Sequence, residues 1–468
     1  MNYLCWIDTI RDTRPRIIGL ARKFGVDRAA LLVITGRGWS VVDRLVTLML
    51  ITTFMTAEAQ GFYYTFASVL SLAIFFELGL GVVLTQYFSH EAAFLQMAKG
   101  GRLSGDELKL QRFRSILQQS FRWYTVLSFL VLAGVGIAGH VFFSQKPVQG
   151  VDWTMAWWGY VLLSTLCVPL QPFLSAVEGV GLVAEIQMLR LISAVTGGLL
   201  LWTALYSGAQ LYAVYCLPFA NFVMGVSFIG LKFPALFREA YSRTAAAAVH
   251  WWSEIWPMQW RIALSWISGY FIYQLFTPIL FHFQGPVVAG QMGMGIVLMT
   301  AIGTINYALV GTKAPRFGHL IARKEYAALD QLFMRVTGVA LAVTVLTSMV
   351  VYGGLAAVKA YTHYGPRFLP LWQLSVLLAV GVLNTFVSAQ SIYLRAHKRE
   401  PFLALNIVGG VLTGLVVSLG GAWYSSGGQC IGFLLVTVLC GLPWATYIFF
   451  RCRSKWHEPV ELDTQAVT

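Results

Sequence analysis

The chain has 468 residues and a net charge of +13, yet only 11% of its residues are charged and 57% are hydrophobic. Soluble domains carry about a quarter charged residues, so this composition excludes an ordinary soluble protein. Apolar runs of about 20 residues, long enough to cross a hydrocarbon core, recur from Leu31 to Phe450. Because a backbone in lipid must satisfy its own hydrogen bonds, we predict an all-α polytopic membrane protein.

The N-terminal segment, residues 1–30, is basic and holds no short apolar core followed by a small-residue cleavage site. We therefore expect no secretory signal peptide, and the first span serves as its own insertion signal. The cysteines and histidines of the chain are scattered, without metal-ligand spacing. This scatter predicts neither a disulfide framework nor a metal site.

Windows of about 19 residues predict twelve membrane spans. An even number of spans places both termini on the same side of the membrane. The predicted spans run near 31–55, 62–88, 119–142, 154–177, 182–206, 212–233, 258–282, 287–311, 333–358, 371–394, 402–424 and 430–450.

The orientation follows from lysine and arginine, which are retained in the cytoplasm when they lie near span ends. These residues gather in the N-terminal segment, the C-terminal tail and every second connection, whereas the alternate connections hold only Lys146, Lys359 and Arg367. We therefore predict that both termini are cytoplasmic. The basic residues are dispersed over short loops without a compact domain, which argues against nucleic acid as a partner. Anionic membrane lipid is the expected partner of such loops.

Two cytoplasmic connections are longer than the others. Residues 89–118 mix charged and apolar positions and are predicted to form an amphipathic surface helix. Residues 234–257 are rich in tryptophan, which favours the membrane interface. We interpret this stretch as a linker between two six-helix bundles of the same orientation, with a cavity between them. The predicted domains are a basic segment 1–30, bundles 31–233 and 258–450, the linker 234–257 and a cytoplasmic tail 451–468.

The first span carries Arg37, Asp43 and Arg44, although a charge at the centre of a membrane helix costs roughly 2.5 to 3.5 kcal/mol. Such residues usually face a bundle interior or water. Arg37 and Arg44 are about two helical turns apart, so they project from one face. Asp43 lies about 100° further round the helix and is expected to meet another span.

The second span holds Glu77, a carboxyl group where any leucine would fit. At 1.5 Å per residue, Arg44 lies about 22 Å and Glu77 about 28 Å from the outside turn near Glu58, a difference that an arginine side chain can bridge. Two interpretations stay open: a structural pair between Arg44 and Glu77, or a site that faces a central cavity.

Three further arginines, Arg122, Arg190 and Arg261, occur near the inside ends of their spans. From such positions a long side chain reaches the membrane interface while its stem stays in the apolar region. Anchoring at the interface is therefore the first interpretation for each of them.

One stretch carries a family resemblance. A short outside turn ends at Gly61, the aromatic start FYYTF follows, and FELGLG ends the span. Over about residues 31–90 the chain resembles the polysaccharide (O-antigen) flippase branch of the multidrug/oligosaccharidyl-lipid/polysaccharide (MOP) exporter superfamily. Beyond these residues the likeness is one of architecture: the length, the twelve spans and the division into two halves.

The resemblance implies a V-shaped pair of helix bundles that alternates between inward-open and outward-open forms. The implied cargo is a polyprenyl-diphosphate-linked oligosaccharide, moved from the cytoplasmic to the outer leaflet of the bacterial inner membrane for O-antigen, capsule or exopolysaccharide synthesis. Polysaccharide polymerase and chain-length proteins are the implied protein partners. The family catalyses no covalent chemistry, so no catalytic residue and no cofactor is expected, and coupling to Na⁺ or H⁺ stays open.

On this resemblance, four arginines would offer charge to the diphosphate, which suits the forked donors of a guanidinium. Two acids would pair with them when the cavity is empty. These candidate residues are Arg37, Arg44, Arg190 and Arg261, with Glu77 and Asp43 as the acids.

Two alternatives remain. A multidrug or cation exporter of the same fold requires an acidic cavity, whereas the predicted spans hold more arginine than acid. An integral membrane glycosyltransferase, polymerase or ligase requires acid/base groups on outside loops, and those loops are short, with Glu58 and Asp152 as their acids.

Overall fold

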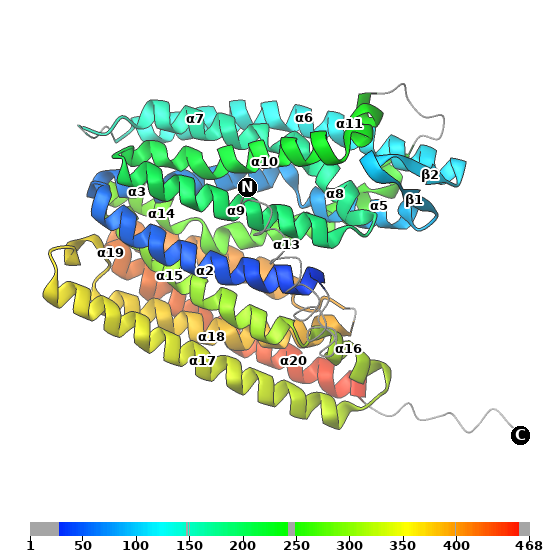
Figure 1. Ribbon diagram of the computed structural model, residues 1–468. Coiled ribbons are helices and arrows are strands. Elements are labelled where there is room, and N and C mark those ends of the chain that lie inside the picture. Colours follow the sequence, from blue (N-terminus) through cyan, green and yellow to red (C-terminus); the bar gives the residue numbers. More distant parts are fainter. Residues whose placement is uncertain (1–27, 147, 149, 242–248, 398, 458–468) are drawn as a thin grey trace, which may run out of the picture.

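The computed structural model describes residues 28–146, 148, 150–241, 249–397 and 399–457 (Figure 1). The described chain is almost entirely helical, which confirms the all-α membrane class. The helices up to the linker are α2 (Arg28–Phe54), α3 (Ala57–Leu70), α4 (Ile74–Glu77), α5 (Leu80–Ala92), α6 (Glu107–Ser144), α7 (Trp153–Leu166), α8 (Gln171–Gly179), α9 (Val183–Tyr206) and α10 (Cys216–Lys232).

Two short linker helices separate these from the second half of the chain. The remaining helices are α11 (Pro234–Tyr241), α12 (Trp251–Glu254), α13 (Trp256–Tyr273), α14 (Phe276–Gln284), α15 (Pro286–Gly311), α16 (Ala314–Ala322), α17 (Tyr326–Tyr361), α18 (Leu371–Ala396), α19 (Leu403–Val436) and α20 (Leu442–His457). Short 3₁₀ turns η1 (Ser71–Ala73), η2 (Lys99–Gly101), η3 (Val168–Leu170), η4 (Gln210–Tyr215) and η5 (Gly365–Arg367), and a π turn, η6 (Thr437–Gly441), connect or extend them.

Within the described residues, nine helical segments are long and apolar enough to cross a membrane, or ten if α13 and α14, bent by 42°, form one span. The charged helix α2 is not one of the nine. One of the nine, residues 403–457, contains two of the predicted spans. The backbone leaves helical geometry at Tyr424 and Ser425, and a Cβ at Gly420 would lie 2.6 Å from the carbonyl oxygen of Gly428. The chain therefore reverses there, as the predicted boundary between 402–424 and 430–450 requires.

The predicted amphipathic surface helix at 89–118 is wrong in its first part. Helix α5 ends at Ala92, and residues 95–105 form an antiparallel hairpin of strands β1 (Leu95–Met97) and β2 (Leu103–Gly105). Gly100 and Gly101, both at positive φ, make its turn, a conformation that favours glycine. Helix α6 then begins after Asp106, whose carboxylate accepts a hydrogen bond from the Lys109 amide at 2.9 Å.

The second predicted span, 62–88, is broken rather than continuous. Helix α4 ends at Glu77 because Leu78 and Gly79 adopt left-handed conformations, with φ of 54° and 67°. A left-handed leucine costs roughly 1 to 2 kcal/mol, so surrounding contacts must hold it. Helix α13 packs against the neighbouring Gly79, since a Cβ there would lie 2.7 Å from Cγ2 of Ile262. The motif ELGLG therefore bends the span where the second half of the chain touches it.

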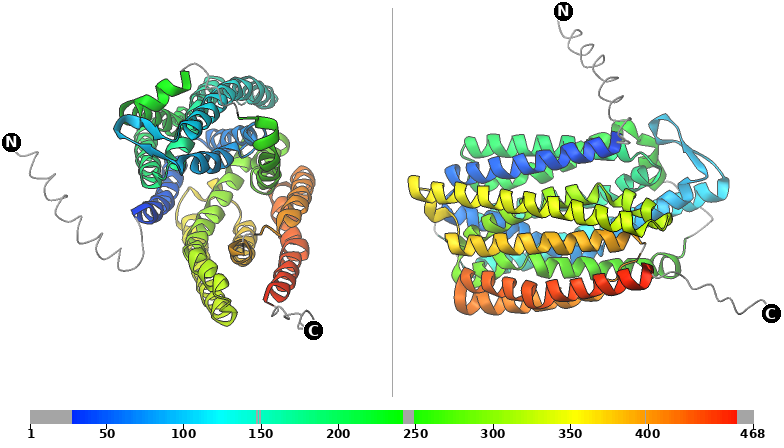
Figure 2. Two further views of the ribbon diagram at one scale, coloured as in Figure 1. Left: turned by 90° about the vertical axis from the view of Figure 1, so that its right-hand side faces the viewer. Right: turned by 90° about the horizontal axis from the view of Figure 1, so that it is seen from below.

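The helices form two bundles, one coloured blue to green and the other yellow-green to red when seen end-on (Figure 2). We call the end where α2 begins and α20 ends the N/C end, which is predicted to be cytoplasmic, and the opposite one the far end. A buried aromatic cluster packs the far half of the first bundle against α14, through Phe62, Phe66, Phe143, Trp157 and Phe281.

The two bundles are in direct contact at the far end. A Cβ at Gly61 on α3 would lie 2.0 Å from the carbonyl oxygen of Pro286 at the start of α15, so the two backbones touch. Beside this contact, Arg367 donates from Nε to Oε1 of Gln60 at 3.0 Å. Arg367 also donates from Nη2 to the carbonyl oxygen of Met55, at the end of α2. The far end is therefore held closed in this conformation.

Candidate functional site

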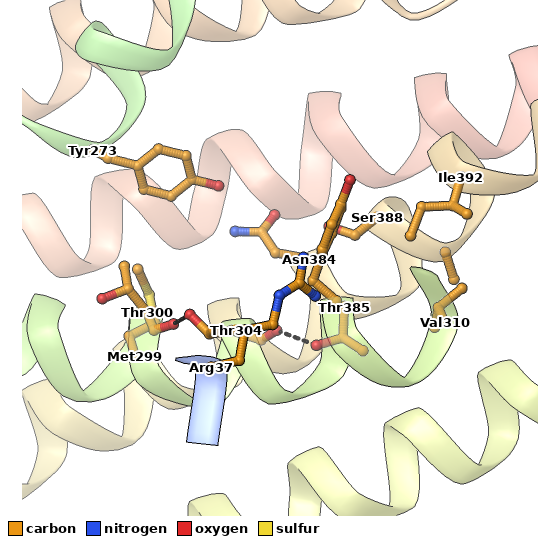
Figure 3. A pocket seen from close by; sticks show the side chains of 14 residues that line it. Arg37, Tyr273, Met299, Thr300, Thr304, Val310, Asn384, Thr385, Ser388 and Ile392 are labelled. Atoms are coloured by element: carbon orange, nitrogen blue, oxygen red, sulfur yellow. Dashed lines mark hydrogen bonds between the residues drawn. The ribbon is translucent and has the colours of Figure 1, made fainter. Parts of the chain in front are cut away.

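A cavity of about 340 Å³ lies among α2, α13, α15 and α18 (Figure 3). One side chain comes from the first bundle and the others come from the second. The lining residues are Arg37, Tyr273, Met299, Thr300, Gly303, Thr304, Tyr307, Val310, Gly381, Asn384, Thr385, Ser388, Ala389 and Ile392.

Arg37 is the charged group of this cavity, and Figure 3 shows its side chain among the polar groups of α15 and α18. Its guanidinium carbon lies 5.3 Å from the ring centre of Tyr307, a cation–π distance. Among the residues that the structure describes, Arg37 forms no ion pair. Its charge is thus balanced by an aromatic face and polar groups, which leaves the guanidinium donors available to an anion.

A second cavity of about 190 Å³ adjoins the first, because Tyr273, Asn384 and Ser388 line both. It extends to Arg395, close to the N/C end of α18. That arginine already donates to both carboxylate oxygens of Glu400, at 2.7 and 2.8 Å. Neither cavity has a carboxylate among its described lining residues. Together they form a neutral to positive polar path from the middle of the second bundle toward the N/C end.

Sequence reasoning missed the polar residues of α18 and α15. Asn384, Ser388, Ser391 and Arg395 follow a spacing of four, three and four positions, which places them on one helix face. This stripe is visible in the sequence as a hydrophilic face within an apolar span. A pattern of single charges does not reveal it, because uncharged polar residues cost less free energy than charged ones in a membrane helix.

Arg44 shares the helix face of Arg37 but lies beside the cavity rather than in its lining. Its Nη1 donates to Oγ1 of Thr304 at 3.3 Å, and Thr304 in turn donates to the Thr300 carbonyl at 2.9 Å. Asp43 points to a different neighbour, since a Cβ at Gly198 on α9 would lie 2.5 Å from its Oδ1. Arg44 therefore supports the cavity wall, and Asp43 meets another span, as expected.

The pairing of Arg44 with Glu77 is wrong. Helix α2 packs mainly on α9 and α15. Arg44 and Glu77 are therefore not neighbours, although they lie at similar depths along their helices. Glu77 instead accepts a hydrogen bond from the Tyr124 hydroxyl on α6 at 3.3 Å. It lines a separate cavity of about 160 Å³ inside the first bundle, together with Gln171. The expectation that Glu77 neutralises a cavity arginine is wrong for the same reason, whereas Asp43 interacts electrostatically with its chain neighbour Arg44.

Glu77→Gln is expected to leave the amount of protein in the membrane unchanged, because the amide oxygen still accepts from Tyr124. Glu77→Leu is expected to lower it, since a part-buried hydroxyl that loses its partner costs about 1 to 3 kcal/mol. Quantitative immunoblotting of the membrane fraction measures both variants. Equal amounts of the two variant proteins would show that the hydrogen bond between Glu77 and Tyr124 does not stabilise the protein.

The remaining candidates lie elsewhere. Arg190 is 57% exposed and donates to Oε2 of Glu178 at 2.9 Å, an ion pair between α9 and α8 at the N/C end. It is thus remote from both central cavities and anchors a surface turn. Arg261 belongs to α13, but its side chain falls outside the described residues.

No protein-family model and no curated protein sequence matches the chain. Solved structures do match it. The inward-facing structure of a multidrug-resistance MATE-family transporter of the MOP superfamily matches with a TM-score of 0.60 at 13% identity, over 88% of this chain and 99% of that one. An outward-facing structure of such a transporter matches with a TM-score of 0.51 at 14% identity, over 92% and 97%.

A third structure is a MOP-superfamily transporter from Pyrococcus furiosus, described by a reversed polarity of its binding pocket. It matches with a TM-score of 0.51 at 13% identity, over 92% of this chain and 96% of that one. At such low identity these matches establish the fold alone. The chain therefore has the V-shaped two-bundle fold of MOP-superfamily transporters, which confirms the expected architecture.

Proposed function

We propose that this protein is a MOP-type transporter that moves an anionic lipid-linked cargo, a polyprenyl-diphosphate-linked oligosaccharide, from the cytoplasmic to the outer leaflet. The observation that carries the proposal is Arg37, which forms no ion pair within the described part of the chain and lies in a polar cavity whose described lining holds no carboxylate. A guanidinium in such a place suits a diphosphate, because its forked donors match phosphate oxygens in pairs.

The conformation supports loading from the N/C end. The far end is closed by the Gly61–Pro286 contact and the hydrogen bonds of Arg367, whereas the two cavities run from the middle of α18 toward the N/C end. The likeness is also greater to the inward-facing relative, at 0.60, than to the outward-facing one, at 0.51. In this conformation Arg37 would receive a diphosphate from the cytoplasmic leaflet.

A multidrug or cation exporter is the second candidate, and one observation favours it. Glu77 is a carboxyl group on a cavity of about 160 Å³ inside the first bundle, where a cation or proton could be held. Multidrug-resistance transporters are also among the solved structures of the same fold. Against this candidate, the larger central cavities have arginines and no described carboxylates in their lining.

A deletion strain separates the two candidates. Loss of surface polysaccharide, with unchanged sensitivity to cationic drugs, is expected if the cargo is the lipid-linked oligosaccharide. Normal surface polysaccharide with increased drug sensitivity would contradict the proposal and favour the cation exporter.

Arg44→Ala is expected to lower surface polysaccharide by several-fold, with the protein still present in the membrane. The hydrogen bond from Arg44 holds Thr304 in the cavity wall, and a hydrogen bond from a charged group contributes about 1.5 to 3 kcal/mol. Quantitative staining of surface glycan, normalised to the amount of protein, measures the effect. Normal glycan in this variant would rule out a role for Arg44 in transport.

A further inference from the structure

A cavity of about 640 Å³ lies at the seam between the bundles, apart from the proposed cargo path. Its walls come from α6, from the linker helix α12, from α13 and from the break in the second span. It is lined by Leu78, Gln119, Arg122, Trp123, Val126, Trp251, Trp252, Trp256 and Gln259.

The walls combine indole rings with one cation. Four of the lining residues are tryptophans, a residue type that favours the level of lipid headgroups. Arg122 is exposed at the edge, and among the described residues it forms no ion pair. The position thus offers an unneutralised guanidinium beside a broad apolar surface.

Gln259 supplies a second, independent observation that points to a ligand. Its side chain is 3% exposed, and its Oε1 is buried without a hydrogen-bond partner among the described residues. Buried amide oxygens are nearly always hydrogen-bonded in native proteins. Because Gln259 lines the cavity, a ligand with a hydroxyl or amine donor would satisfy it.

The height of the cavity matches a headgroup layer. Arg122 lies about 33 Å along α6 from Ser144 at the far end, at 1.5 Å per residue. A hydrocarbon core of about 30 Å would end close to this arginine. The indole rings would then face the part of the acyl chains that adjoins the headgroups, and the guanidinium would face the phosphate layer.

We propose that this cavity binds one anionic phospholipid of the adjacent leaflet, with a glycerol-type headgroup as in phosphatidylglycerol. The phosphate would accept hydrogen bonds from Arg122, a headgroup hydroxyl would donate to Oε1 of Gln259, and an acyl chain would lie along the tryptophans. The net positive charge of the chain, +13, favours an anionic over a zwitterionic lipid. The site contacts both bundles through α6 and α13 and does not depend on which cargo is transported.

Native mass spectrometry of the purified full chain tests the proposal, in micelles that contain equal amounts of phosphatidylglycerol and phosphatidylcholine. The wild type is expected to retain one phosphatidylglycerol more than Arg122→Gln, which should bind that lipid about fivefold more weakly. Gln259→Leu should also weaken retention. Arg238→Gln, which removes an exposed arginine on α11, is the matched control and should behave like the wild type.

Three outcomes would overturn the proposal. The first is equal phosphatidylglycerol retention in the wild type and Arg122→Gln. The second is equal retention of phosphatidylcholine, which would make the cavity a nonspecific apolar groove. The third is displacement of phosphatidylglycerol by stoichiometric polyprenyl phosphate, which would make it an entry portal for cargo.

Discussion

Arg37→Ala is expected to abolish transport while the protein still accumulates in the membrane. Arg37 forms no ion pair in the described structure, so its removal leaves no buried partner without a contact. The loss of a charged hydrogen bond to the diphosphate should weaken cargo capture by about tenfold to a hundredfold. Surface polysaccharide, measured in cells that depend on this chain, should fall to the level of the deletion strain.

A conservative variant and a control variant accompany this test. Arg37→Lys keeps the charge but loses the forked donors, so partial activity is expected. Arg190→Ala removes an exposed arginine whose partner is Glu178 at the N/C end, and it should leave surface polysaccharide normal. Full activity of Arg37→Ala, or an equal loss in Arg190→Ala, would contradict the role given to Arg37.

Gly61→Val is expected to prevent closure of the far end. A Cβ at Gly61 would lie 2.0 Å from the carbonyl oxygen of Pro286, a backbone atom that cannot rotate away. Overpacking of this kind typically costs about 1 to 3 kcal/mol, enough to shift the population toward a conformation with the far ends apart. Spin labels at Ser144→Cys and Tyr361→Cys, in a background without native cysteines, report the distance between the two far ends.

The control for this experiment is Gly338→Ala on α17, where an added Cβ would meet nothing within 4 Å. It should give the same distance distribution as the wild type. The Gly61→Val distribution should move to longer distances, and transport should fall because the far end no longer closes. An unchanged distribution would show that the Gly61–Pro286 contact does not hold the conformation.

The sequence was sufficient to predict the fold class, because an all-α membrane protein follows from hydrophobicity along the chain. Even the boundary between 402–424 and 430–450 agrees with the reversal at Tyr424 and Ser425. The hairpin at 95–105 was missed because its strands are three residues long, too short for an alternating pattern. The break at Leu78 was missed because leucine gives no signal for a left-handed conformation.

The site was predictable only in part. The depth of a charge follows from counting residues along its helix, but its lateral neighbour depends on which helices pack together. The inward position of Arg37 therefore agrees with its depth and helix face, whereas the predicted Arg44–Glu77 pair is wrong. The packing of α2 on α9 and α15 and the contact between Glu77 and Tyr124 are tertiary facts that periodicity does not contain.

The central claim is that Arg37 receives a diphosphate in the cavity between α2, α15 and α18. Its most direct test is leaflet transfer of a fluorescent polyprenyl-diphosphate-linked oligosaccharide in vesicles that contain the purified protein. We expect transfer with the wild type and none with Arg37→Gln, at equal amounts of reconstituted protein. Equal transfer by both proteins, or wild-type transport of a cationic dye without transfer of the lipid-linked oligosaccharide, would contradict the claim.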